Sequence, residues 1–559
     1  MRPPAIAPAQ ATVAFTPPPQ TPPQSLELDA AEASWRVASE AERANSALCV
    51  DHYYHAAALS WPYLGPQVAE GDRQRAWQLY HASLSKLIET GQRFYRLEAT
   101  RGLKVNTARG AGFVAIEYGG FPWQPDDFER LEPTRARNND PKIDRAIVQN
   151  GLGVPLVALR QRKQANDFLS GRTAFAATAV LEPGASGIDN NVVQAMYGSP
   201  DQSVPRIATL RLIDPTRVDQ VDVSGQPIPI ARNLSAAVSD SLSKTEESPI
   251  DRLLRPEMSN EFDGLQMLEP YQPGKIPVIF VHGLISDRST WSNMTNELRA
   301  TPWINARYQF WYFQYPTGEP FLRSALTLRE QTRAAVQQLD PLGQDRALSQ
   351  MVLIGHSMGG LVSKLQVTYS STTIWDRYSN RPFSTIQGPP EGLNQVWRLF
   401  FFEPQPFVKR VVFIGTPHQG AAMASRVVGR LAANMVQEPA DRQQMHRSLV
   451  AANPGTFEAE FQRRIPTSVD LLEPDSPLLA AMAQLPFASD VRIHSIVGMR
   501  QRLLESPSDG VVPVASARHP NATSEYFINT SHGQLARHAE AIADVSRILA
   551  EHLNEPAAR

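Results

Sequence analysis

A serine flanked by glycines, placed between an apolar run and a helical segment, constrains this chain more than any other feature. The motif GHSMG at 355–359 follows an apolar run at 349–354 with strand character and precedes residues 360–367, which have helical spacing. In such a strand–turn–helix the glycines remove side chains where the elements crowd, and the serine hydroxyl rises above a sheet edge. A bare G-x-S-x-G also occurs by chance as an ordinary turn, so the flanking elements carry the prediction that Ser357 is a nucleophile.

Length and composition describe a large folded protein. With 559 residues the chain is too long for one small core, which predicts two or three domains. Hydrophobic residues make up 42% and charged residues 20%, and the formal net charge is −2, so we expect no nucleic-acid partner. No apolar run reaches the roughly 18 residues that a membrane-spanning helix needs.

The first 25 residues are rich in proline. Residues 1–24 contain eight prolines and no continuous apolar stretch, which is typical of a disordered tail. A secretory signal peptide needs an apolar central region, so we expect none in this sequence. The compartment stays open, because a start further upstream would permit export.

The chain between residues 26 and 273 divides by periodicity into three segments. Residues 26–97 predict helices, because apolar residues recur at spacings of three and four. Residues 98–235 hold short β-rich runs between Gly, Pro, Asn and Asp clusters, which predicts an accessory domain such as a small sandwich. Residues 236–273 are polar and contain several prolines, which predicts a linker. We find no chemistry and no internal repeat in this half.

From residue 274 to 559 strands and helices alternate, which predicts an α/β domain with a doubly wound, mostly parallel sheet. Apolar runs such as VVFI at 411–414 have no polar face and suit parallel strands buried on both sides. We expect strands over 276–281, 308–315, 351–354, 408–414, 491–497 and 525–529, and helices over 291–298, 322–339 and 534–553.

A serine hydroxyl is a weak nucleophile and needs a base, which in turn needs an orienting acid. His532 is the preferred base, because it follows the last predicted strand and precedes the last helix. His519, in the loop before that strand, is the competitor. His494 and His538 fall inside a predicted strand and a predicted helix, where packing and solvation account for them.

The preferred acid is Asp509, in a Ser-Asp-Gly sequence on the loop after the strand predicted at 491–497. Asp-Gly is also a common turn, but here room remains for one short strand before His532. Glu505 is the fallback acid. Asp490 precedes the strand and would lie at the opposite end of the sheet.

A tetrahedral intermediate needs backbone N–H donors for its oxyanion. Residues 281–284 end the first strand of the predicted sheet, and their loop should lie beside the serine turn. We therefore expect the backbone amides of Leu284 and Met358 to form the oxyanion hole. For His282 we favour a structural role, bonding to a loop backbone, over that of a general base.

Four motifs together resemble the α/β-hydrolase superfamily: VHGL at 281–284, GHSMGG at 355–360, GTPHQG at 415–420 and DGVVP at 509–513. Within it, about residues 270–555 are similar to bacterial triacylglycerol lipases and PGAP1-like serine esterases. The resemblance implies an α/β-hydrolase fold and hydrolysis of carboxylic esters through an acyl-enzyme. The calcium site of lipases is not carried over, because a matching carboxylate pair is missing, and we expect neither cofactor nor metal.

Residues 371–406 and 420–486 are long insertions, and the first is rich in aromatic residues. Cap segments occupy such places in the family, and an apolar cap suits an acyl ester, either a small molecule or a lipid, with peripheral contact at a lipid surface left open. The alternative is that these aromatic residues only hold the cap to the sheet.

The same triad would also serve an acyltransferase or an amidase. A further alternative is a surface or scaffold protein whose residues 26–235 bind a partner.

Overall fold

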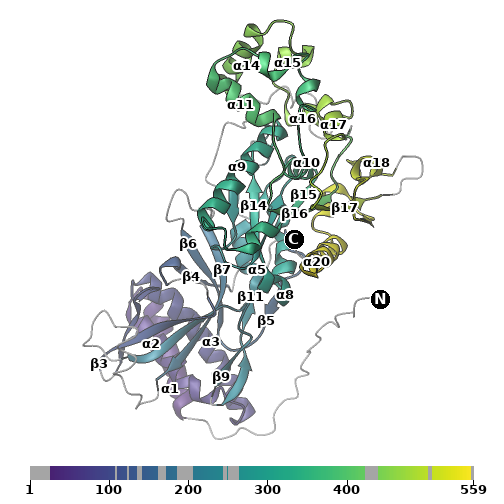
Figure 1. Cartoon of the computed structure of the whole chain (residues 1–559). Helices are drawn as coiled ribbons and strands as arrows, with labels where there is room; N and C mark the ends of the chain where they lie inside the picture. Colours follow the sequence, from purple (N-terminus) through teal and green to yellow (C-terminus); the bar gives the residue numbers. More distant parts are fainter. Residues whose placement is uncertain are drawn as a thin grey trace.

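A computed structural model describes residues 26–107, 110–121, 125–134, 141–161, 172–184, 206–223, 225–242, 249, 253, 263–421, 439–500 and 507–554. The described residues form two units, each built on a seven-stranded sheet. Figure 1 shows the amino-terminal unit at the lower left and the carboxyl-terminal unit above it. The proline-rich tail predicted for residues 1–25 lies outside the described residues.

The amino-terminal sheet has the strand order β1-β2-β3-β8-β7-β6-β4. Its neighbours are antiparallel except for the parallel pair of β3 and β8. It is a single mixed sheet and not the sandwich that the short β-rich runs suggested. The strands are β1 (Leu97–Glu98), β2 (Gly102–Thr107), β3 (Gly110–Gly119), β4 (Arg130–Pro133), β6 (Val154–Gln161), β7 (Arg172–Pro183) and β8 (Arg206–Ile213). Two short ribbons join β9 (Gln220–Val223) to β10 (Gln226–Pro229) and β5 (Val148–Gln149) to β11 (Arg232–Asn233).

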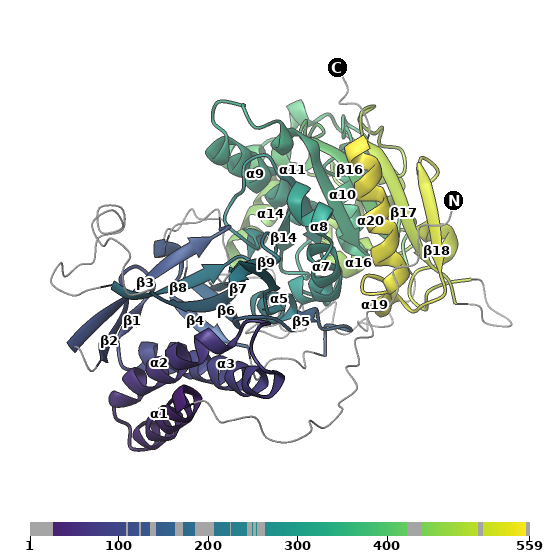
Figure 2. The ribbon, with the colours of Figure 1, turned by 90° about the horizontal axis from the view of Figure 1, so that it is seen from below.

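Three helices cover one face of this sheet, as Figure 2 shows from below: α1 (Leu26–Arg43), α2 (Leu48–Ser60) and α3 (Glu70–Arg93). Helix and strand residues share one core, in which Val50 and Tyr80 join Phe175 and Leu210. The boundary expected at residue 97 therefore falls inside a single packed unit. Helices with one apolar stripe are stable only where that stripe is buried, and here the sheet buries it.

The segment 236–273, expected to be a linker, contains buried structure at both ends. Helix α5 (Leu234–Leu242) packs Ala236 against β6 and β7 of the first sheet and Val238 against the core of the second unit. Ser241 also bonds the backbone of Ala174. The small residues of α5 read as a loop in the sequence, but they allow a helix to fit between two sheets.

The carboxyl-terminal sheet has the order β12-β14-β13-β15-β16-β17-β18. All neighbours are parallel except β12, which pairs antiparallel with β14. The predicted strands agree to within a few residues, but the edge strand β12 was not predicted. The strands are β12 (Gly264–Met267), β13 (Ile276–Val281), β14 (Tyr308–Gln314), β15 (Met351–His356), β16 (Val408–Ile414), β17 (Arg492–Gly498) and β18 (Ser524–Ile528).

Helices cover both faces of this sheet. One face carries α9 (Phe321–Leu339) and α10 (Met358–Lys364), and the other carries η3 (Arg288–Trp291), α7 (Ser292–Arg299), α8 (Pro302–Arg307) and α20 (Ala539–Asn554). The helix expected over 534–553 is divided into α19 (His532–Leu535) and α20. Above the carboxyl ends of the strands, at the top of Figure 1, lie the insertion helices α11 (Pro390–Phe400), α14 (Ala440–Ala452), α15 (Ala459–Arg463), α16 (Ser468–Leu471) and α17 (Pro477–Met482).

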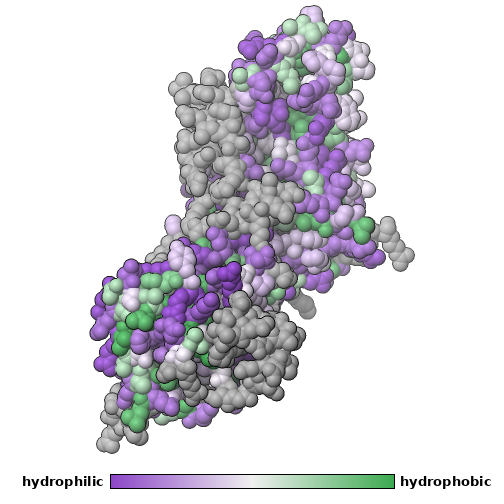
Figure 3. Space-filling view, turned by 90° about the vertical axis from the view of Figure 1, so that its left-hand side faces the viewer, coloured by the Kyte–Doolittle hydropathy of each residue, from purple (hydrophilic) through white to green (hydrophobic). Residues whose placement is uncertain are grey.

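The surface that Figure 3 presents is mostly hydrophilic, with hydrophobic residues in smaller groups. Large hydrophobic side chains that are exposed belong to many separate elements: Leu26, Tyr95, Trp303, Leu342 and Trp397 are examples. Scattered apolar side chains of this kind are normal on folded proteins. Of the helices that the structure describes, none is both long and apolar enough to cross a bilayer.

Candidate active site

Ser357 lies in a sharp turn between β15 and α10, with φ 53° and ψ −126°. A non-glycine residue in this region is strained, and such strain persists only where the surroundings hold it. The turn needs its glycines, because a Cβ on Gly359 would lie 2.2 Å from the carbonyl oxygen of Val281. A Cβ on Gly355 would lie 2.5 Å from the carbonyl oxygen of Gly359. The backbone thus presents Ser357 at the carboxyl edge of the sheet.

The loop after β13 passes directly over this serine. A Cβ on Gly283 would lie 2.9 Å from the Cβ of Ser357. Next along the chain, Leu284 has a backbone N–H that donates to no other residue in the described part of the chain, and neither does that of Met358 at the start of α10. Among the described residues these two N–H groups have no hydrogen-bond partner, and the loop that carries Leu284 lies beside Ser357.

As expected, the imidazole of His282 bonds to backbone atoms. Its Nδ1 lies 3.0 Å from the carbonyl oxygen of Gly283, and its Nε2 accepts the N–H of Tyr315 at 3.2 Å. The tyrosine hydroxyl donates to the carbonyl oxygen of His282 at 2.7 Å. These bonds of His282 and Tyr315 hold in place the loop that carries Leu284.

Asp509 and His532 form a direct pair. The distance from His532 Nδ1 to Asp509 Oδ2 is 2.6 Å, and the backbone N–H of His532 donates to the carbonyl oxygen of Asp509 at 3.0 Å. The other carboxylate oxygen accepts the N–H groups of Val511 at 2.9 Å and Val512 at 2.7 Å. Asp509 is only 1% exposed, and its buried carboxylate is held in one orientation by three hydrogen bonds.

Contacts with His356 and Gly415 hold the Asp509–His532 pair beside the serine turn. The ring of His356, which precedes Ser357, lies 4.8 Å from the ring of His532, and its Nε2 lies 3.2 Å from the carbonyl oxygen of that residue. A Cβ on Gly415 would lie 3.3 Å from His532 Nδ1 and 3.4 Å from Asp509 Oδ2. Among the described residues no hydrogen bond joins Ser357 to His532; in proteins without substrate such contacts are often long.

His356 is itself buried and neutral. Burial, aided by the neighbouring His532, lowers its pKa to about 3. The neutral ring of His356 therefore adds no positive charge beside His532. His356 stands inside the GHSMG motif, but no local sequence pattern marks its contact with His532.

The competing residues lie elsewhere. His519 contacts the rings of His418 at 4.8 Å and Phe487 at 5.1 Å, and burial lowers its pKa to about 4. His494, inside β17, bonds Arg410 and the hydroxyl of Ser524. Asp490 pairs with Lys409 at the amino end of β17, and Glu505 lies outside the described residues. Of the acids and bases considered, the structure brings together Asp509 and His532.

The aromatic residues of the first insertion mostly face inward. Trp375 is 2% exposed and packs against Phe400, Phe401 and the ring of Phe457 from the second insertion. Trp397 is 49% exposed. Packing within the cap therefore accounts for the buried members of this group. Residues 422–438 of the second insertion lie outside the described residues.

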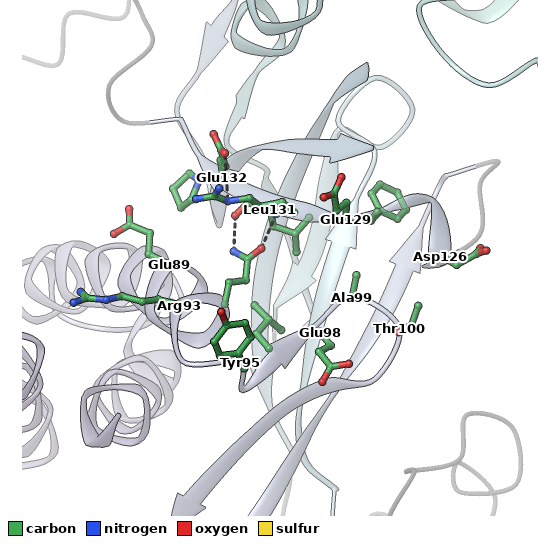
Figure 4. A pocket seen from close by; sticks show the side chains of 15 residues that line it. Glu89, Arg93, Tyr95, Glu98, Ala99, Thr100, Asp126, Glu129, Leu131 and Glu132 are labelled. Atoms are coloured by element: carbon green, nitrogen blue, oxygen red, sulfur yellow. Dashed lines mark hydrogen bonds and ion pairs between the residues drawn. The ribbon is translucent and has the colours of Figure 1, made fainter. Parts of the chain in front are cut away.

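The amino-terminal unit has a cavity of its own, of about 790 Å³, where α3 ends and β4 begins. Gln92 holds its wall through two hydrogen bonds with the backbone of Leu131, drawn as dashed lines in Figure 4. Five carboxylates line it, at positions 89, 98, 126, 129 and 132, beside Arg93 and Arg130. No candidate catalytic residue lies in this cavity. In the described part of the chain no three His, Cys, Asp or Glu side chains gather as metal ligands.

A mostly parallel sheet with helices on both faces and a strained serine turn after a central strand is the α/β-hydrolase fold, and the carboxyl-terminal unit has this fold. Residues 272–377 match the family model of the PGAP1-like alpha/beta domain. The resemblance seen in the sequence motifs is thereby confirmed over this range.

Solved structures that are similar include bacterial lipases and esterases. Lipase BlEst2 of Bacillus licheniformis, in mature form, is 16% identical over 51% of this chain and 94% of that chain, with a TM-score of 0.30. EstA from Clostridium botulinum is 14% identical over 56% and 98% of the two chains, with a TM-score of 0.30. Lipase 1 from Pelosinus fermentans is 14% identical over 51% and 100%, with a TM-score of 0.28. No curated protein matches the chain.

Proposed function

We propose that the protein is a serine hydrolase of carboxylic esters that works through an acyl-enzyme. The observation that carries the proposal is the buried contact of 2.6 Å between Asp509 and His532, placed beside the strained Ser357 turn. An imidazole whose Nδ1–H is held by a carboxylate has its Nε2 lone pair available as a base. An apolar acyl group is part of the proposal: the aromatic-rich first insertion lies above this edge (Figure 1), where packing within the cap accounts for its buried aromatic residues.

In the proposed reaction His532 Nε2 takes the proton of the Ser357 hydroxyl as the oxygen attacks the ester carbonyl. The backbone amides of Leu284 and Met358 hold the oxyanion, for which their unused N–H groups are suited. The C–O bond to the alcohol then breaks, and His532 gives its proton to the departing oxygen. Water, deprotonated by the same imidazole, attacks the acyl-enzyme; the bond from the acyl carbon to Ser357 Oγ then breaks, His532 returns the proton to that oxygen, and the carboxylic acid leaves. Asp509 holds the imidazole in one tautomer throughout.

The test is turnover of p-nitrophenyl esters by Ser357→Ala. Because the nucleophile is lost, we expect kcat to fall by about 10⁵-fold or more. The matched control is Ser349→Ala, since Ser349 is exposed and its hydroxyl bonds only the backbone of Arg346. A Ser357→Ala protein that hydrolyses esters at the wild-type rate would refute the proposal. A series of acyl lengths, with and without micelles, separates a lipase from an esterase for soluble substrates.

A further inference from the structure

The amino-terminal unit approaches the candidate active site through residues 141–147, which we call the strap. The strap leads into β5, whose position beside the catalytic unit can be followed in Figure 2. It contacts η3 and α7, which follow the Leu284 loop, and also Arg537, which follows α19 and its first residue His532. The strap is far away in the sequence, yet it contacts elements that adjoin both the Leu284 loop and the His532 segment.

On the side of the Leu284 loop, the strap holds the start of η3. Lys142 Nζ donates to the hydroxyl of Ser289 at 2.7 Å. The same turn is capped by Asp287, whose Oδ1 accepts the N–H of Ser289 at 2.8 Å. Burial opposes ionisation of Asp287, but hydrogen bonds from Ser289 and the charge of Lys142 lower its pKa overall. The strap thus stabilises an ionised cap three residues beyond Leu284.

On the side of His532, the link runs through Asn293 of α7. This side chain is 4% exposed; its Oδ1 accepts the N–H of Asp144 at 3.0 Å, and its Nδ2 donates to Asp144 Oδ2 at 2.9 Å and to the carbonyl oxygen of Arg537 at 2.8 Å. The Arg537 guanidinium in turn pairs with Asp144 and donates to the carbonyl oxygen of Pro141 at 3.2 Å. One buried amide is therefore satisfied jointly by the strap and by the segment after His532.

Apolar packing reinforces this link. Ile143 packs against the core cluster in which side chains of α7, such as Met294, are buried together with Leu535 and Ala536. Loss of one partner from this network leaves the buried amide of Asn293 with an unsatisfied polar group.

We propose that the strap is a positioning element that keeps the Leu284 loop and His532 in register over Ser357, with Asp144 and Asn293 as its positioning residues. This inference rests on the proposed function, because it assigns the amino-terminal unit a role in the same reaction. Catalytic groups tolerate little displacement, and a misplacement of about 1 Å can lower a rate by up to about 100-fold.

The test compares two neighbouring positions of the strap in the full chain. Asp144→Ala removes the carboxylate that bonds Asn293 Nδ2 and Arg537 but keeps the backbone N–H that donates to Asn293 Oδ1, and we expect kcat for p-nitrophenyl butyrate to fall roughly tenfold with little change in KM. Asp144→Asn keeps an acceptor for Asn293 and should recover most of the rate. Arg145→Ala is the matched control, because its guanidinium bonds Glu297 at 3.1 Å, in the last turn of α7, and makes no described hydrogen bond or ion pair with residues 532–537. Asp144 and Arg145 have side chains 54% and 71% exposed, so neither change threatens the core.

A second measurement is independent of ester turnover. Hydrogen–deuterium exchange of peptides covering residues 529–538 should be faster in Asp144→Ala than in the wild type, and unchanged in Arg145→Ala. Equal kcat and equal exchange in all these proteins, or the same loss in both alanine variants, would overturn the inference. If the wild type hydrolyses no ester, the proposed function fails, while the exchange of 529–538 still decides whether the strap orders the histidine segment.

Discussion

The two sheets have the same number of strands, but they use the ends of their strands differently. In the carboxyl-terminal sheet five neighbouring strand pairs are parallel, so the loops after β13, β15, β16, β17 and β18 all emerge at one edge. In the amino-terminal sheet only β3 and β8 are parallel, and successive strand ends alternate between edges. The candidate catalytic residues therefore lie where the parallel topology makes loops converge. The amino-terminal sheet instead packs against helices, and its unit carries the strap.

The largest effect after that of Ser357→Ala is expected for Asp509→Asn, which tests whether the residues at the carboxyl edge of the parallel sheet act together. Asparagine can still accept the N–H groups of Val511 and Val512, but it no longer holds the imidazole in the productive tautomer. We expect kcat for p-nitrophenyl esters to fall roughly 10³- to 10⁴-fold, with the protein still folded by circular dichroism. Asp490→Asn, at the opposite end of β17, should keep the wild-type rate. An Asp509→Asn protein within a factor of about ten of the wild type would move the acid elsewhere.

A second prediction concerns the amino-terminal unit. The fully buried Tyr80 hydroxyl donates to the carbonyl oxygen of Leu181 at 2.9 Å and accepts the N–H of Leu181 at 2.8 Å. Leu181 lies beyond the residues of β7 that pair with β6. Tyr80→Phe leaves both backbone groups unsatisfied, so the free energy of unfolding in urea should fall by about 1–3 kcal/mol. We expect ester turnover to stay unchanged. Tyr95→Phe is the control, since Tyr95 is 89% exposed; equal stability of the two variants would contradict the prediction.

The smallest expected effect is a dependence of stability on pH that arises in the carboxyl-terminal unit. Burial, with the nearby charge of Arg410, lowers the pKa of His494 from 6.5 to about 3. Between these values the unfolded chain binds a proton that the folded protein does not, so the free energy of unfolding falls as the pH drops below 6.5. One such histidine contributes a slope of at most about 1.4 kcal/mol per pH unit.

Replacing this group measures its share of the slope. His494→Gln keeps an acceptor for Arg410 but cannot titrate, so urea unfolding between pH 6.5 and 4.5 should show a shallower pH dependence than in the wild type. His356 and His519, whose pKa values are lowered to about 3 and about 4, would still contribute. An identical slope in variant and wild type would show that His494 is not buried in its neutral form.

Much of the carboxyl-terminal fold was predictable, because β13 and β16 are apolar runs buried on both faces. The strand β12 was missed, since it is a four-residue antiparallel edge with polar flanks, and α5 was missed because its small residues show no helical stripe. Ser357, Asp509 and His532 could be selected from local motifs. Asn293 could not, because its partner Asp144 is 149 residues away and nothing near either residue marks the contact.

Local sequence patterns specify the kinds of elements and the chain order of Ser357, Asp509 and His532, because periodicity and turn residues act over a few neighbouring positions. Only the tertiary structure decided that 26–97 and 98–235 share one core, that α5 lies between the two sheets, and that the strap reaches Asn293. Contacts of this kind join residues far apart in the chain, and they depend on the order in which strands pair rather than on any local pattern.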